Sequence, residues 1–235
     1  DAYNVDLAAA TTAFEVGQAL WMLGERLDPV VRSEVTAAIE RRVFEPFRTT
    51  LRTGRGLTWV HATHNWNAVC MAGTVGAALA VLSNREERAV FAAAAEHYSR
   101  NFLAGFGRDG YCSEGIGYWN YGFGHFALLR ETLWQATEGR LDLFLDPRVR
   151  EAARYGVRIE IVDGQFPTIA DCPPGTRPSA SLLRYCSLAL GLGLSEQERA
   201  WRPADQSPRS LAMAAMEIFP SSLRGVRPAG TSAEQ

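Results

Sequence analysis

The sequence HNWNAVCMAGTVGAALAVL, residues 64–82, begins with amide, imidazole and indole groups and continues as the longest apolar run of the chain. The run from Ala68 to Leu82 is rich in Ala and Gly, and it is too short to cross a bilayer, which takes roughly 20 residues. We therefore expect a buried core helix. Buried polar groups cost free energy unless they are hydrogen bonded, so the polar residues at its amino-terminal end suggest a ligand site.

A second segment of the same character, EGIGYWNYG at residues 114–122, follows about fifty residues later and also precedes a helical pattern. Aromatic rings and amides gathered at helix ends suit a polar, ring-shaped ligand such as a sugar. We expect the two segments to open onto the same end of the fold and to form one site.

Helical periodicity covers nearly every long segment, and strand alternation is scarce. The predicted helices span about residues 5–27, 29–47, 65–82, 84–103, 119–136, 147–157, 179–192, 195–200 and 207–218, with one short strand at 159–162. Helices beginning near 5, 65, 119 and 179 indicate a helix pair repeated about every sixty residues. Such pairs pack as antiparallel hairpins in a bundle, solenoid or toroid. We expect an all-α fold, an incomplete (α/α) toroid over residues 1–218, with a flexible tail at 219–235.

Composition narrows the classes of partner. The chain has 235 residues, is 47% hydrophobic and carries a formal net charge of −2, so no broad basic field favours nucleic acid or a membrane surface. We expect neither as a partner. The Gly-rich segment has neither phosphate-binding nor dinucleotide-binding spacing, and we expect no cofactor.

The four cysteines have no metal-binding spacing, and we expect no metal site. Cys70 and Cys186 lie in apolar helical patterns and should be buried thiols. Cys112 and Cys172 fall in predicted loops, where a disulfide between them is left open.

Three side chains of the second segment and the helix that follows it are spaced so that they could act together in catalysis. Tyr118, Tyr121 and His125 stand at i, i+3 and i+7 and share a helical face. A Tyr hydroxyl beside an imidazole can act as a general acid or base, although core packing is the alternative for such a stripe. Near the first segment, the amide of Asn65 can donate to a substrate carboxylate or enolate without adding charge.

Two carboxylates remain open to two interpretations each. Glu114 fits a glycosidase-type acid, or a loop carboxylate that bonds nearby backbone N–H groups. Asp171 either lines the site or caps a turn. We expect His61 and His97 to be structural.

The segments 64–70, 109–111 and 114–122 together resemble the heparinase II/III-like polysaccharide lyases, and alginate lyases with the same α/α toroid are similar. The resemblance covers roughly residues 1–200. It implies β-elimination on a uronic-acid-containing polysaccharide, and a periplasmic or secreted location. Elimination needs no carboxylate pair, and it does need relief of negative charge as the carbanion forms.

The resemblance also implies roles for individual residues. Asn65 would neutralise the uronate carboxylate, with His64 or Asn67 as less favoured substitutes. Tyr121 would take the C5 proton or protonate the leaving oxygen, with His125 as its partner. The remaining positions implied to contact substrate are Trp66, Asn67, Glu114, Tyr118 and Trp119. For the three aromatic residues among them, packing in the core is an equal possibility.

One departure from that family concerns the β-sandwich region that follows its toroid and usually supplies a further His and metal ligands. This chain has no strand-rich segment, so we expect a carbon–oxygen lyase that is a fragment, a natural truncation or a relative that has lost catalysis. In the first case the rest of a longer protein would supply the β region. Two alternatives stay open: a non-catalytic carbohydrate-binding helical module, and an α/α-toroid glycoside hydrolase. The hydrolase would use Glu114 as its acid, with Asp109 or Asp171 as the second carboxylate.

Overall fold

A computed structural model of the chain describes residues 5–193 and 213–214. This part of the protein is mostly helical with almost no strand, which confirms the all-α prediction. The α-helices are α1 (Leu7–Leu23), α2 (Pro29–Ile39), α3 (Glu45–Thr53), α4 (Asn65–Val81), α5 (Arg85–Ala104), α6 (Gly115–Tyr118), α7 (Gly124–Ala136), α8 (Arg148–Arg158) and α9 (Ala180–Leu190). Two π-helical turns, η2 (Glu40–Phe44) and η4 (Trp119–Phe123), join α2 to α3 and α6 to α7. Short 3-10 turns are η1 (Gly24–Arg26), η3 (Thr58–His61) and η5 (Leu143–Leu145).

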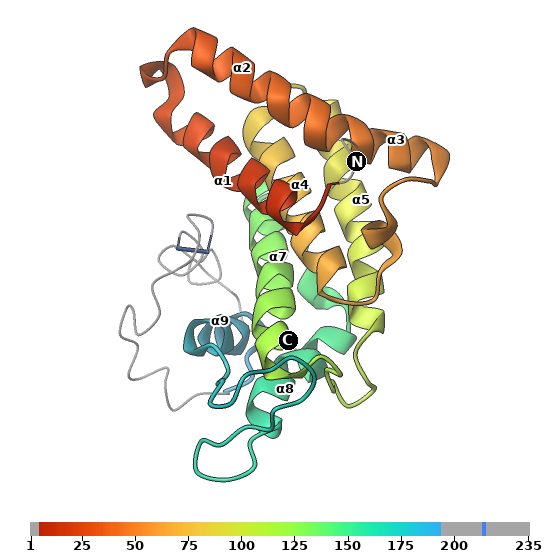
Figure 1. Ribbon diagram of the computed structural model, residues 1–235, viewed down its shortest axis with the longest axis vertical. Helices are drawn as coiled ribbons and strands as arrows, with labels where there is room; N and C mark the ends of the chain where they lie inside the picture. The colour runs from red at the N-terminus through yellow and green to blue at the C-terminus, as the bar shows by residue number, and fades with distance from the viewer. Residues whose placement is uncertain (1–4, 194–212, 215–235) are drawn as a thin grey trace, which may run out of the picture.

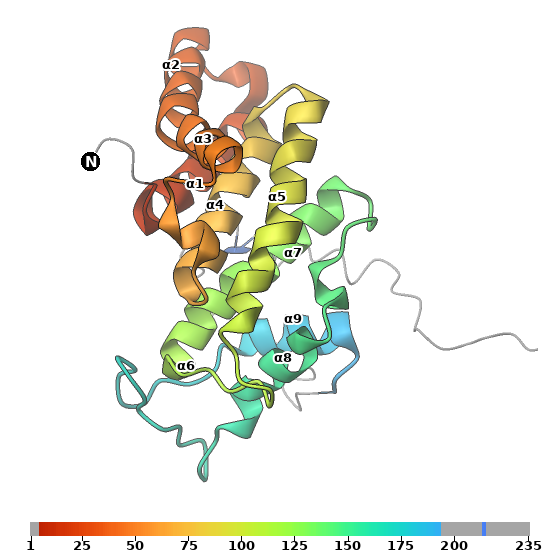
Figure 2. The same ribbon diagram turned by 90° about the vertical axis from the view of Figure 1, so that its right-hand side faces the viewer.

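The sixty-residue spacing appears in the packing. Helices α1, α4 and α9 begin at Leu7, Asn65 and Ala180, close to the predicted starts. Helix α4 packs against α1 on one side and α7 on the other, and α7 contacts α9 (Figure 1). The intervening helices α2, α5 and α8 follow as second members of the pairs, and α8 lies beside α9 (Figure 2).

The helix starts follow ordinary capping chemistry. The Asp28 carboxylate accepts hydrogen bonds from the backbone nitrogens of Val30 (2.8 Å) and Val31 (3.3 Å) at the start of α2, and Pro29 occupies the first helical position. The Asn84 side chain caps α5 in the same way, accepting from the Glu86 nitrogen at 2.8 Å. These starts are therefore encoded locally.

Helix α4 is buried around its whole circumference, as its composition predicted. Every residue from Asn67 to Ala78 is buried. A Cβ atom on Gly73 would lie 2.4 Å from the carbonyl carbon of Ala10, so the backbones of α1 and α4 touch there. The Ala- and Gly-rich sequence permits this close approach because larger side chains would separate the helices.

A polar cluster in the core fixes α9 against α7. The Arg130 guanidinium donates to both carboxylate oxygens of Asp142, at 2.7 and 2.9 Å. The Tyr185 hydroxyl of α9 donates to Glu131 of α7 at 2.7 Å. These buried groups have partners, as buried polar atoms require.

Two predicted helix boundaries and one predicted strand were wrong. The helix beginning at Pro29 continues to Thr53 rather than ending near residue 47, because Phe47 and Thr50 face the core and the left-handed Gly54 ends it (φ 67°). The helix predicted from about 119 begins at Gly115. No strand forms at 159–162, where exposed residues make a single bridge between Val162 and Gln165 around a turn.

Other predictions can be compared only in part. The four cysteines are free and buried, which confirms the expectation for Cys70 and Cys186 and shows no disulfide between Cys112 and Cys172. The predicted helix at 195–200 and the tail at 219–235 lie outside the described residues. So does the predicted helix at 207–218, apart from 213–214, which are helical. The described helices include none that is long and apolar enough to span a bilayer.

We predict that Gly73→Ala lowers the free energy of unfolding by about 2 kcal/mol, because the added methyl overlaps the backbone of α1. Urea denaturation followed by circular dichroism measures the change. Gly17→Ala is the matched control, since its added Cβ would meet the end of the Val81 side chain at 3.2 Å, which can move. Equal losses in the two variants would show that the backbone contact at Gly73 is no tighter than the α1–α4 contact at Gly17.

Candidate functional site

The two polar-aromatic segments come together at the amino-terminal end of α4. A Cβ on Gly122 would lie 3.0 Å from the Cβ of Asn65 and 3.2 Å from its Cα, so the helix carrying Tyr121 rests directly on the start of α4. The backbone nitrogen of Asn65 donates to the Glu114 carboxylate at 3.4 Å. The prediction that these remote segments are neighbours is confirmed.

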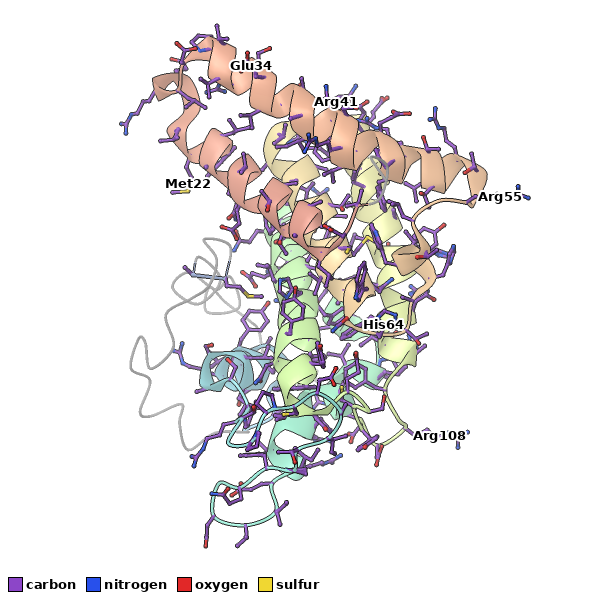
Figure 3. The ribbon with its side chains drawn as sticks, in the orientation of Figure 1. Met22, Glu34, Arg41, Arg55, His64 and Arg108 are labelled. Atoms are coloured by element: carbon purple, nitrogen blue, oxygen red, sulfur yellow. The ribbon has the colours of Figure 1, made fainter. Side chains whose placement is uncertain are left out.

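Glu114 and His64 both serve the first turn of α4. His64 is the N-cap residue, and its Nδ1 accepts from the Trp66 nitrogen at 3.5 Å. The Glu114 carboxylate lies at the same positive end of the helix, where negative charge is stabilising. Of the two interpretations of Glu114, the one in which it bonds backbone N–H groups is confirmed. The imidazole of His64 is exposed at this end of the helix (Figure 3).

The two asparagines of the first segment have different surroundings. Asn65 is 4% exposed, and its side-chain amide has no hydrogen bond to any residue within 5–193. Asn67 is fully buried, and its nitrogen donates to the carbonyls of Trp59 (3.1 Å) and Val60 (2.9 Å). The prediction that Asn67 contacts substrate is therefore wrong, because its amide fixes η3 against α4. Asn65 keeps an amide available.

Tyr121 and His125 lie one turn apart and contact each other. Tyr121 lies in the π-helical turn η4, a feature often found at functional sites, and is 36% exposed. Its ring meets that of His125 edge to face, with centroids 4.8 Å apart. His125 Nδ1 lies 2.7 Å from the Tyr121 carbonyl oxygen, which can only accept, so Nδ1 carries the proton. In the neutral ring Nε2 then holds the free lone pair.

The surroundings of this pair favour its uncharged forms. Burial lowers the pKa of His125, and the hydrogen bond to the Tyr121 carbonyl and the Glu15 carboxylate only partly oppose this. Burial raises the pKa of Tyr121, with smaller contributions from Cys70 and Tyr118. At neutral pH the site thus offers a neutral imidazole that can accept a proton and a phenol that can donate one.

The aromatic residues divide between core and surface. Trp119 is fully buried, and its Nε1 donates to the Ala152 carbonyl at 2.8 Å. Of the two possibilities left open for Trp119, the structure shows packing, because the ring lies between η4 and α8. Trp66 and Tyr118 are half-buried and keep part of their rings accessible.

A small cavity of about 120 Å³ lies where the segments meet, and His64, Glu114 and Tyr118 contribute to its lining. Asn65, Tyr121 and His125 do not line it. This volume is below the roughly 300–1,000 Å³ typical of an enclosed ligand pocket. A large ligand would have to lie over the exposed Tyr121.

The sequence did not predict the role of Asn120, although this residue belongs to the segment 114–122. Its Nδ2 donates to the Arg177 carbonyl at 2.8 Å and its Oδ1 accepts from the Ser179 nitrogen at 2.7 Å. The residue adjacent to Tyr121 therefore ties the segment before α9 to the site. An Asn next to the candidate phenol was the available signal.

The other candidate residues have structural surroundings. Asp171 is exposed, and Asp109 accepts from the Tyr111 nitrogen at 3.1 Å. His61 and His97 each meet Tyr98 edge to face, in agreement with their predicted structural role. Within residues 5–193 and 213–214, no three His, Cys, Asp or Glu side chains are grouped to hold a metal ion.

Comparison with known proteins gives no family assignment: no family model matches the chain, and no curated protein matches it.

We predict that Glu114→Ala lowers the free energy of unfolding by about 1 kcal/mol, because it removes the charge and acceptor at the start of α4. Chemical denaturation measures the loss. The matched control is Glu96→Ala, at an exposed position within α5. An equal change in both variants would contradict the role of Glu114 in joining the segments.

Proposed function

We propose that this chain is a polysaccharide lyase, or the helical part of one, that cleaves a uronic-acid-containing anionic glycan by β-elimination. The observation that carries the proposal is the contact between Gly122, which directly follows Tyr121, and Asn65, whose amide has no hydrogen bond within residues 5–193. The Tyr121 ring in turn meets that of His125. An amide donor and a proton-transfer pair are what this reaction requires. The resemblance of the same two segments to heparinase II/III-like lyases adds to it.

The proposal also places the helical hairpins in an incomplete α/α toroid. Helices α1, α4, α7 and α9 would form the inner layer, since consecutive members of this series pack on one another. The site would then open at the end of the layer where α4 begins.

The lowered pKa of His125 and the raised pKa of Tyr121 favour His125 as the base and Tyr121 as the acid. A neutral His125 with a free Nε2 can remove the C5 proton, while the Asn65 amide donates to the uronate carboxylate and stabilises the developing enolate. The C4–oxygen bond then breaks, its electrons pass to the leaving oxygen, and the Tyr121 hydroxyl protonates that oxygen. A phenol with a raised pKa suits this acid role better than that of a base.

A non-catalytic carbohydrate-binding module is the second candidate. The small volume of the cavity at the meeting point favours it, because a surface site can hold a glycan without enclosing the reacting bond. Retention on an immobilised uronan without any unsaturated product would select this function.

We expect Tyr121→Phe to abolish product formation, because the phenol supplies the proton to the leaving group. Incubation with alginate, hyaluronan or heparin, followed by ultraviolet absorbance of the unsaturated uronate, measures it. Tyr111→Phe, at another exposed tyrosine, should keep the wild-type rate. Wild-type rate in Tyr121→Phe with unchanged circular dichroism would refute the assigned acid.

The pH dependence distinguishes the two possible bases. With His125 as base, kcat/KM should rise as pH increases through a value below about 6.5, where the imidazole loses its proton. It should fall only above about pH 10, where Tyr121 ionises. If Tyr121 were the base, the rate would instead keep rising up to the phenol pKa, and the assignment would be reversed.

A further inference from the structure

A second cavity, of about 680 Å³, lies at the other end of α4 from the candidate site. It is formed by α1, α4, α5 and α7 together with the segment that follows α7. Its volume is within the roughly 300–1,000 Å³ of small-molecule sites. Asn65, Tyr121 and His125 do not line it, so the lyase reaction does not account for this cavity.

The inner wall of this cavity is apolar. Phe14 of α1, Leu79 of α4 and Leu128 of α7 line it, and the Phe14 ring packs directly on Gly76, where a Cβ would lie 2.5 Å from it. Trp21, which is 73% exposed, lies at the rim. These groups suit a flat, apolar ring system, because burial of such a ring is favourable at about 25 cal/mol per Å².

Three arginines line the same cavity. Arg85 and Arg88 come from the first turn of α5, and Arg140 follows α7. Arg140 Nε donates to the Thr137 carbonyl at 2.9 Å, whereas Arg85 and Arg88 form no ion pair with any residue in 5–193. Arg88 is half-buried, and a partly desolvated guanidinium without a carboxylate favours an anion beside it.

Glu131, the carboxylate that lines the cavity, forms no ion pair with Arg85 or Arg88. Glu131 accepts from the Tyr185 hydroxyl at 2.7 Å and from the Gln135 amide at 2.8 Å, so its oxygens are directed to α9 and to its own helix. A different group is left without a partner: the side-chain oxygen of Gln18 is buried and accepts no hydrogen bond from the described residues. It calls for a donor on the ligand.

We propose that this cavity binds a hydroxylated aromatic acid. The ring lies on Phe14, Leu79 and Leu128, the acid group pairs with Arg88 and Arg85, and the hydroxyl donates to Gln18. The ring, the acid group and the hydroxyl each match a group of the lining that is apolar or has no partner. The inference is independent of the lyase proposal, because it uses a different part of the protein.

The first test titrates the full chain with 6-hydroxy-2-naphthoate at low salt, followed by its fluorescence or by calorimetry. We expect one site, with 2-naphthol, which lacks the acid group, binding about tenfold more weakly, the change that a charge-assisted hydrogen bond supplies. Arg88→Gln should weaken the naphthoate by a similar factor. Arg41→Gln, at an exposed arginine outside the lining (Figure 3), should leave it unchanged.

The second test fills the cavity. Ala89 is exposed and lines the cavity, whereas Ala93, one turn later on α5, is exposed and does not. We expect Ala89→Trp to abolish binding and Ala93→Trp to retain it, with equal helicity in both. The proposal is overturned if wild-type protein does not bind the naphthoate, if naphthol binds equally well, or if either variant behaves like its control.

Discussion

The close approach of α1 and η4 to α4 is the constraint on which the rest of the structure depends. Gly73 brings the backbone of α1 against α4, and Gly122 brings the Tyr121 segment against Asn65. Each contact is possible because one partner has no side chain. Interiors of proteins are packed densely, so a methyl group added at either position has to displace a helix or a residue of the site.

This packing makes α4 a shared support for two regions of different chemistry. Its first turn carries Asn65, which contacts Glu114 and Gly122, while its last turns form part of the wall of a mainly apolar cavity that arginines also line. The polar first turn is satisfied by His64 and Glu114, which cap the helix from two distant parts of the chain. The positive end of a buried helix thereby fixes where the two motifs meet.

The chemistry proposed for the site follows from its surroundings as much as from residue type. A tyrosine and a histidine one turn apart allow either residue to act as acid or base. Burial of both, together with the bond from His125 Nδ1 to the Tyr121 carbonyl, makes neutral imidazole the better acceptor and phenol the better donor. The assignment depends on neighbours that are remote in sequence, such as Glu15 on α1.

The sequence by itself determined the helical class, the sixty-residue spacing of helix pairs, the capped starts at Asp28 and Asn84 and the buried character of α4. These depend on local periodicity, capping groups and hydrophobicity, which act over a few residues. Only the tertiary structure decided that Trp119 and Asn67 belong to the core, that the helix from Pro29 runs on to Thr53, and that no strand forms at 159–162. Contacts between distant segments decide which side chains are buried and whether a strand finds a partner. The periodicity within one segment carries no information about those contacts.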